Sequence, residues 1–259
     1  MTSILSTTLL YATIPVVFTV IGAMFAAYWP RIAKWRTYVL HLAAGVVFSV
    51  VAVELLPEIT RRGLVIDVVI GFAAGIITMV LVDELLDRMN ARRKNESATS
   101  SLSASGSIGR STAGQSVLSL AVPVGVDFVL DGLLLGVGFA AGAKIGILLA
   151  LAEAVEQLAV GMALGVELRA SGSSSLRTVL FSSALALLVY VSALAGGTVL
   201  SHVSDAPMEA ILSFGLAALL YLVTEELLRE AHEEGETRIG TTLFFAGFLA
   251  FLIVGMTLG

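Results

Sequence analysis

The sequence has no cysteine, only three histidines and few charged residues. Without cysteine the chain can form no disulfide, no thiolate nucleophile and no sulfur-ligated metal site, and its redox compartment stays open. Charged residues occupy 14% of the 259 positions, whereas soluble domains carry about 25%. This scarcity argues strongly against a water-soluble enzyme. The net charge of -5 also gives no basic surface for nucleic acid.

Apolar residues are in excess. They make up 57% of the chain and raise its mean hydropathy to +0.96. A helix that crosses a bilayer needs about 20 mostly apolar residues. Such stretches occur eight times, at 9–28, 38–56, 64–86, 117–140, 143–168, 178–201, 208–228 and 239–258. The sequence therefore predicts an all-α integral membrane protein with eight transmembrane helices, in a single transmembrane domain over residues 1–259.

One hydrophilic stretch, 88–116, separates the third and fourth predicted spans. It is rich in Ser, Gly and Ala and contains an Arg-Arg-Lys run, so it predicts a flexible, solvated loop. Twelve of the fifteen Lys and Arg residues fall on the side of this loop, and three, Arg61, Arg62 and Lys144, fall on the other. The positive-inside rule then predicts that the loop is cytoplasmic and that both termini lie outside, in a plasma or inner membrane.

Two similar segments end the second and seventh predicted spans. The second span ends in Glu54-Leu55-Leu56-Pro57-Glu58, and the seventh in Glu226-Leu227-Leu228-Arg229-Glu230. On the orientation above, the two segments lie at opposite faces of the membrane. This pattern predicts a 3+2+3 arrangement, an inverted repeat of spans one to three and six to eight with spans four and five between them. Glu54 and Glu226 are candidate ligands along a path through the membrane, although a solvated helix end explains Glu226 equally well.

Two pairs of carboxylates lie inside predicted spans, Asp127 and Asp131 in the fourth and Glu153 and Glu156 in the fifth. An ionised group at the bilayer centre costs about 2.5 to 3.5 kcal/mol, so each is a functional hypothesis. Their spacings put each pair on one helical face, and all four can meet near the midplane. Because no Lys or Arg lies in the interior of the spans, they must bind cations or protons. The alternative is that they are protonated and hydrogen-bonded as polar contacts between helices.

Glycines in the same two spans indicate close helix packing. Gly132 and Gly136 in the fourth span, and Gly161 and Gly165 in the fifth, have the small-xxx-small spacing of tightly packed transmembrane helices. They predict that these two spans form a close pair.

Several polar residues near span ends have simpler explanations. Asp83, Glu84 and Asp87, at the cytoplasmic end of the third span, fit a solvated face. His41, at the inner end of the second span, fits an interfacial position.

The residues above resemble the motifs of the ZIP family of zinc and iron transporters. Residues 127–132, Asp-Phe-Val-Leu-Asp-Gly, resemble the family's His-Asn-x-Pro-Asp/Glu-Gly. Residues 153–161, Glu-Ala-Val-Glu-Gln-Leu-Ala-Val-Gly, resemble its x-Asp/Glu/Asn-x-Pro-Glu-Gly-Leu-Ala-Val-Gly. The ends of spans two and seven resemble its His-Leu-Leu-Pro-Glu and His-Glu-x-x-Pro-Glu-x-His. The resemblance runs over most of the chain and includes the eight spans and the long loop after span three.

This resemblance implies a binuclear metal centre between spans four and five. Position by position, Asp131 and Glu156 take the places of the bridging carboxylates, Asp127 that of a His ligand and Glu153 that of a second-metal ligand. The chain departs from the family where Phe128 and Ala152 replace ligating side chains, where Gln157 replaces the motif Gly, and where both motif prolines are missing. These departures favour one carboxylate-dominated site over two complete sites.

Residues and resemblance together predict a ZIP-like transporter that moves divalent metal cations inward. The metal is its substrate. The resemblance implies Zn²⁺ or Fe²⁺, and carboxylate ligands also suit harder ions such as Mn²⁺; Cd²⁺ is a further candidate, and no organic cofactor is expected. The expected partners are the metal ions, the lipid bilayer and a second copy of the chain in a homodimer.

Two other functions stay open at the level of sequence. A ZIP-like protein could hold metal as a sensor or structural ion without transport, which Phe128 and Ala152 favour. A glutamate-dependent intramembrane protease of the CAAX-processing type is suggested by Glu225 and Glu226 followed by Arg229, but the spacing is one residue short of that family's pattern.

Overall fold

The computed structural model describes residues 2–29, 33–62, 64–103, 112–200, 205–232 and 238–258, and every regular element within them is helical. In chain order these elements are α1 (Thr2–Tyr28), α2 (Ala33–Val50), η2 (Val51–Leu55), α3 (Leu56–Arg62), α4 (Val65–Ser103), α5 (Thr112–Ala141), α6 (Ala143–Ala170), α7 (Ser175–Leu200), α8 (Asp205–Tyr221), η3 (Leu222–Leu227), α9 (Leu228–His232) and α10 (Arg238–Thr257). The two η elements are short π-helices.

Eight helical segments of the described chain are long and apolar enough to cross a membrane. They run over Ser6–Tyr28, Trp35–Arg61, Val65–Met89, Ala121–Ala141, Ala143–Ala170, Ser175–Thr198, Pro207–Leu227 and Arg238–Thr257. The prediction of a multi-pass, all-helical membrane protein is therefore confirmed. The second span extends furthest beyond its predicted end, because α2, η2 and α3 follow one another without a break.

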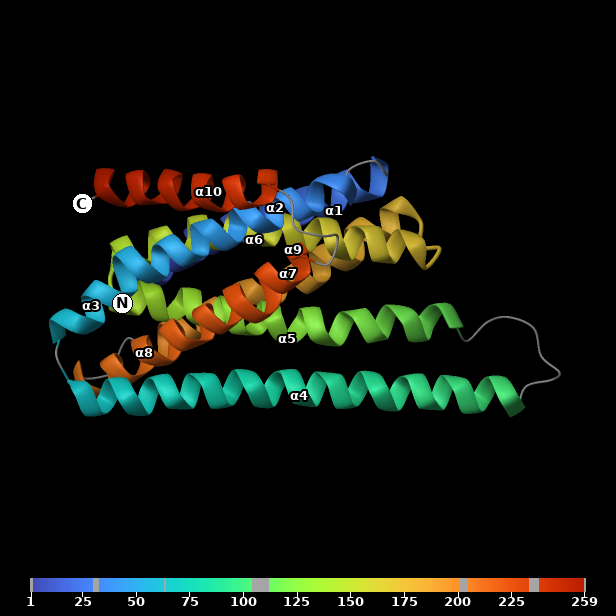
Figure 1. Ribbon diagram of the computed structural model, residues 1–259, viewed down its shortest axis with the longest axis horizontal. Coiled ribbons are helices and arrows are strands. Elements are labelled where there is room, and N and C mark those ends of the chain that lie inside the picture. Colours follow the sequence, from blue (N-terminus) through green and yellow to red (C-terminus); the bar gives the residue numbers. More distant parts are fainter. Residues whose placement is uncertain are drawn as a thin grey trace.

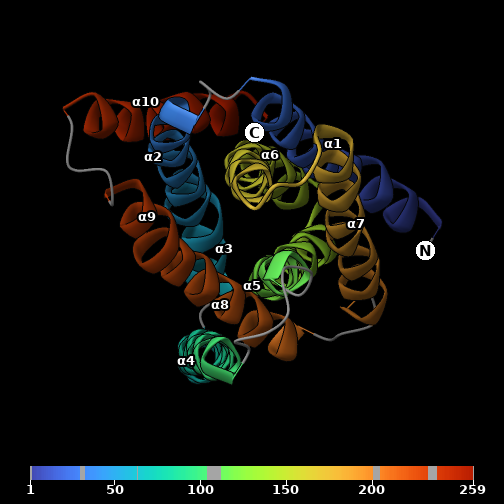
Figure 2. The ribbon, with the colours of Figure 1, turned by 90° about the vertical axis from the view of Figure 1, so that its right-hand side faces the viewer.

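The helices lie side by side in an elongated bundle, and both described ends of the chain lie at the same end of it (Figure 1). α6 occupies the interior, packed against α1, α2 and α5, while α7 packs against α1 and α5. Two helices are peripheral: α4 packs mainly on α8, and α10 mainly on α2 (Figure 2). The two spans that carry the predicted carboxylate pairs, α5 and α6, are thus among the most enclosed helices.

The glycine motifs contact other helices than those predicted. A Cβ at Gly132 would lie 2.3 Å from the backbone oxygen of Val189 on α7, and one at Gly161 would lie 2.2 Å from the backbone oxygen of Thr19 on α1. The expectation that these glycines form a close pair between spans four and five is therefore wrong. They bring α7 onto α5 and α1 onto α6.

The stretch 88–116 is helical at both of its ends, which corrects the prediction of a flexible loop there. α4 continues to Ser103 and α5 begins at Thr112, while residues 104–111 lie outside the described chain. Extending an existing helix adds one hydrogen bond for each residue that is fixed, so no new nucleus has to form. The side chain of Arg88 also hydrogen-bonds to Glu84 one turn earlier, a pairing that stabilises helices.

Both π-helical turns coincide with the two similar segments of the sequence. η2 ends at Leu55 and η3 ends at Leu227, so Glu54 and Glu226 each lie one residue before the end of a π-helix. π-helical turns are rare and concentrate at functional sites. The π-helical turns therefore mark both glutamates as candidate functional residues.

Candidate metal centre

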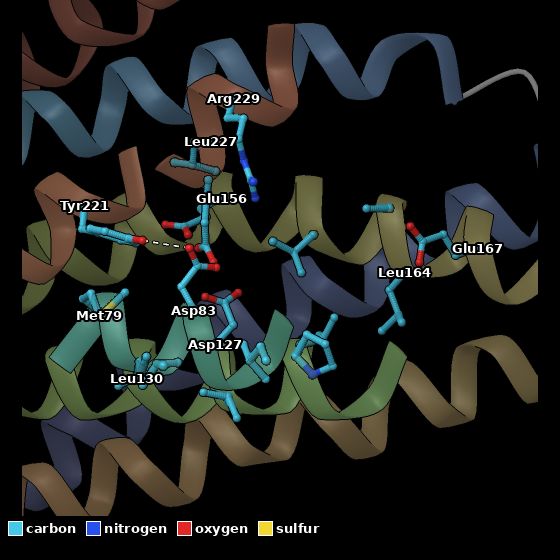
Figure 3. Close-up of a pocket in the computed structure, with 18 residues that line it drawn as sticks. Met79, Asp83, Asp127, Leu130, Glu156, Leu164, Glu167, Tyr221, Leu227 and Arg229 are labelled. Carbon is cyan, nitrogen blue, oxygen red and sulfur yellow. Dashed lines mark hydrogen bonds between the residues drawn. The ribbon is translucent and has the colours of Figure 1, made fainter. Parts of the chain in front are cut away.

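A cavity of about 280 Å³ opens between α4, α5, α6 and the end of α8. Its acidic lining comes from four different elements, with Asp83 on α4, Asp127 on α5, Glu156 on α6 and Glu226 on η3. Figure 3 shows the carboxylates of Asp83, Asp127 and Glu156 turned toward a common space. Like charges held this close in a low-dielectric site repel one another, so the cavity is suited to a cation.

Asp83 belongs to this cavity, and its assignment to a solvated face is wrong. Its carboxylate accepts a hydrogen bond of 2.9 Å from the hydroxyl of Tyr221 on α8, drawn as a dashed line in Figure 3. α4 packs on α8, and this packing turns one of the three acidic residues inward. Glu84 and Asp87 remain exposed, as the sequence predicts for them.

Among the described residues that line the cavity, Arg229 is the one basic side chain. It follows Glu226 by three residues, close enough to interact with it electrostatically, and in Figure 3 its side chain extends toward the carboxylates. Glu167 also lines the cavity, but it lies farther along α6 with an exposed side chain (Figure 3).

The four predicted site carboxylates lie close enough together to interact. Asp127 interacts electrostatically with Asp131 and Glu226, and Glu156 with Asp127, Glu153 and Glu226. Only Asp127 and Glu156 line the cavity. Asp131 and Glu153 lie deeper, and both are buried.

Asp131 is held by a neighbouring amide. The Gln157 side-chain N–H donates a 2.7 Å hydrogen bond to Asp131 Oδ2, and the Thr19 hydroxyl donates one of 2.8 Å to Gln157 Oε1. These three side chains come from α5, α6 and α1, and all of them are buried.

Glu153 has no such support. It is 2% exposed, and neither of its carboxylate oxygens has a hydrogen-bond partner in the described structure. A buried carboxylate without a partner is strongly unfavourable unless it binds a proton or a cation.

Two positions singled out by the resemblance to the ZIP motifs hold apolar, buried side chains. Phe128 on α5 and Ala152 on α6 are both enclosed in the protein. In the described residues no three His, Asp or Glu side chains converge closely enough to hold one metal ion. A metal ion held by this cluster would therefore draw side chains together from their present rotamers, and the predicted metal centre stays a prediction.

Glu54 lies apart from the cavity. Its carboxylate forms an ion pair of 3.2 Å with Lys144 at the start of α6. The sequence offered no salt-bridge partner for an acidic residue inside a span, and this partner comes from the first turn of the interior helix. The role of Glu54 as a ligand stays a prediction.

Two histidines meet at the other end of α2. The rings of His41 and His232 pack edge to face with centroids 5.2 Å apart, and His41 Nδ1 lies 2.8 Å from the backbone oxygen of Thr37. His41 is buried in the protein, and its predicted position at the membrane interface stays a prediction. The contact joins α2 to α9. The two histidines are 191 positions apart in the sequence, so the sequence could not indicate that they meet.

Fold and site define a class of protein, a multi-pass helical membrane protein with buried carboxylates between its central helices. Among curated proteins the chain is similar to the zinc transporter GufA of Myxococcus xanthus, with 34% identity over 130 residues. The match covers 50% of this chain and 51% of that protein, so the chain spans about half the length of the curated relative it matches. That relative is named as a transporter, which agrees with the expectation that the chain is not an enzyme. A scan against protein families found no match.

Sequence reasoning placed Asp83 on a solvated face, and it missed Tyr221 and the role of Gln157. The first two were hidden because they meet only when α4 packs on α8. Gln157 carried a signal, since a large polar amide inside a span needs hydrogen-bond partners.

Proposed function

We propose that this protein is a ZIP-like transporter that moves divalent metal cations across the membrane through a carboxylate site on α5 and α6. The observation that carries this proposal is the cavity lined by acidic side chains from α4, α5, α6 and η3. Carboxylate oxygens bind divalent cations readily. The similarity to a named zinc transporter adds Zn²⁺ as the first candidate substrate, with Fe²⁺, Mn²⁺ and Cd²⁺ next.

The proposed site uses Asp127, Asp131, Glu153 and Glu156 as metal ligands. Glu226 is proposed as a further ligand at the cavity, and Glu54 as a ligand nearer the opposite end of the path. The unsupported carboxylate of Glu153 supports this assignment, because a cation would supply its missing partner.

Uptake into proteoliposomes tests the proposal with Zn²⁺, Fe²⁺, Mn²⁺, Cd²⁺ and Mg²⁺ supplied one at a time. We expect flux of at least one ion, and we expect Glu156→Ala to reduce it to background. Glu167→Ala is the matched control, since Glu167 lies on the same helix and lines the same cavity but is exposed and set apart. Equal flux through wild type and Glu156→Ala would overturn the proposal.

A second candidate is a protein that binds metal as a sensor or structural ion without transport. The burial of Phe128 and Ala152 at positions where the family has ligands favours it. No flux in any ion, combined with equilibrium binding that is lost in Glu156→Ala, would select this function over the first.

For the arrangement in the membrane we propose a 3+2+3 inverted repeat, with both termini outside and residues 88–116 on the cytoplasmic side. The two π-helical turns at matching motifs support the repeat, and the distribution of Lys and Arg supports the orientation. Reporter fusions at each end of the chain test the orientation, and activity of the reporters on the cytoplasmic side would overturn it.

We also propose that the chain forms a homodimer in a plasma or inner membrane. α4 and α10 each present large exposed apolar side chains, among them Ile70, Ile77, Phe245 and Leu249. Mass measurement in nanodiscs tests this assembly, and a single chain in each particle would overturn it.

A further inference from the structure

A hydrogen-bonded chain of three side chains joins α1 to the carboxylate cluster. It runs from the Thr19 hydroxyl to Gln157 Oε1 over 2.8 Å, and from Gln157 Nε2 to Asp131 Oδ2 over 2.7 Å. Thr19 and Gln157 have no exposed surface, and Asp131 is 2% exposed. A buried network whose members are satisfied is rigid and specifies one arrangement.

The direction of the amide follows from its neighbours. A carboxylate accepts hydrogen bonds, so the N–H end of the Gln157 amide faces Asp131 and its oxygen faces Thr19. The Thr19 hydroxyl also lies 3.0 Å from the backbone oxygen of Pro15, but its contact to Gln157 is the shorter one. The carboxylate of Asp131 therefore sets the direction of the amide, and the Thr19 hydroxyl supports it by donating to the amide oxygen.

Close packing keeps Thr19 in this place. Gly161, one turn after Gln157 on α6, lets the backbone of Thr19 approach so closely that a Cβ would lie 2.2 Å from the Thr19 oxygen. Gly22 on α1 meets the backbone of Leu158 in the same way, at 2.3 Å. The register of α1 on α6 is thereby fixed, and the Thr19–Gln157 contact with it.

The amide occupies one side of a carboxylate that would otherwise have two oxygens for metal ions. A carboxylate that bridges two cations gives one oxygen to each. With Oδ2 of Asp131 bound to an N–H donor at 2.7 Å, its Oδ1 remains for a cation. An amide hydrogen carries partial positive charge, so it takes the place of a cation without adding a full charge to the cluster.

We propose that Gln157 is a positioning residue that holds Asp131 from one side and limits the centre to a single divalent cation. The inference rests on the proposed function, because it takes the carboxylate cluster as a cation site. It goes further because it makes one residue, Gln157, responsible for the number of ions that the centre accepts. Thr19 supports Gln157 in this role.

The experiment counts metal ions in the purified full chain in nanodiscs. Mn²⁺ and Zn²⁺ are titrated separately, bound metal is measured by elemental mass spectrometry, and the Mn²⁺-loaded protein is examined by electron paramagnetic resonance. We expect one ion for each wild-type chain and a spectrum of isolated Mn²⁺. We expect Gln157→Ala to accept a second ion, with the exchange-coupled spectrum of two Mn²⁺ that share a carboxylate.

Thr19→Val provides a second variant that keeps the shape of the side chain. It removes the hydroxyl that donates to the amide oxygen, so it should keep one ion and lower its affinity about 10- to 100-fold, as changes to supporting residues do. Thr178→Val is the matched control. Thr178 is equally buried, on α7, and its hydroxyl has no hydrogen-bond partner in the described structure, so this variant should bind as wild type does.

Two ions in the wild type, one ion in a folded Gln157→Ala, or unchanged affinity in Thr19→Val would each overturn the inference. The proposed function fails separately. If the wild-type chain binds two ions and transports them, the proposed function stands and only the limit set by Gln157 is wrong. If the chain neither binds nor transports divalent cations, both proposals are wrong.

Discussion

Glu54 and Glu226 occupy matching places in two π-helical turns, each one residue before the end of the turn and each followed by a pair of leucines. Their surroundings differ. Glu54 forms an ion pair with Lys144 at 3.2 Å, whereas Glu226 lines a cavity with Asp83, Asp127 and Glu156. A similar sequence and the same local helix therefore produce two chemically different glutamates. The fold pairs Glu54 with Lys144, whereas it sets Glu226 among three carboxylates with Arg229 beside it.

The largest difference between the two turns should appear in transport. Glu226→Gln removes one of the charges that draw a cation into the cavity. Loss of a residue that supports a metal site lowers affinity or activity about 10- to 100-fold, and we expect Glu226→Gln to lower divalent-cation uptake by at least this factor. Glu54→Gln is the parallel variant. Because the Glu54 carboxylate is already paired with Lys144, we expect this change to lower uptake by a smaller factor than Glu226→Gln does. Initial rates in proteoliposomes measure both, and equal losses in the two variants would contradict the difference between the two turns.

A smaller effect is expected at the hydrogen bond beside η3. Tyr221→Phe removes the hydroxyl that donates to Asp83. A hydrogen bond to a charged group contributes about 1.5 to 3 kcal/mol, and partial exposure of this pair places the expected loss of unfolding free energy near the lower end. Thermal unfolding in detergent measures it. Tyr190→Phe, on α7, serves as the control. An equal loss of unfolding free energy there would show that the Tyr221–Asp83 hydrogen bond has no particular effect on stability.

The ion pair beside η2 should be worth less again. Lys144 is 41% exposed and Glu54 12% exposed, so solvent screens their attraction. We expect a coupling of about 0.5 to 1 kcal/mol between Glu54→Gln and Lys144→Gln in a double-mutant cycle. The measurement is the free energy of unfolding of the two single variants and the double variant. Additive losses would mean that the pair contributes no stability of its own.

The smallest effect is expected where α10 meets η2. A Cβ at Gly255 would lie 2.9 Å from Glu54 Oε1, which is the movable end of a side chain. Gly255→Ala should therefore cost less than about 1 kcal/mol, since the carboxylate can rotate away. The same change at Gly45 brings a Cβ within 1.9 Å of the Phe244 backbone oxygen, and it should cost several times more. Unfolding midpoints of the two variants give the comparison.

The fold was largely predictable, since a membrane span is recorded locally in the sequence. Each of the eight spans follows from a run of apolar residues, and the structure moves their ends by a few positions. The prediction of a loop over 88–116 failed at the two ends of the stretch. Residues such as Ser, Gly and Ala predict a loop only where no helix already runs into them. α4 carries its hydrogen-bond ladder through to Ser103.

The site was predictable only in part. Asp127, Asp131, Glu153 and Glu156 stand out because charge inside a span is costly, whatever the tertiary structure. Asp83 lies close to a span end, where the same rule gives no signal, and only the packing of α4 on α8 brings it to Tyr221. The contacts of Glu54 with Lys144 and of His41 with His232 are likewise products of tertiary structure.

The length of α4 has a practical consequence for structure determination. Its apolar span ends at Met89, and the helix continues to Ser103, which at about 1.5 Å for each residue carries it about 21 Å further. A chain of 27.0 kDa, alone or as a dimer, is too small and too featureless in a micelle to be aligned easily in electron micrographs. A rigid partner fused in helical register to this projecting segment would supply a visible landmark outside the micelle, without touching any residue of the carboxylate cluster.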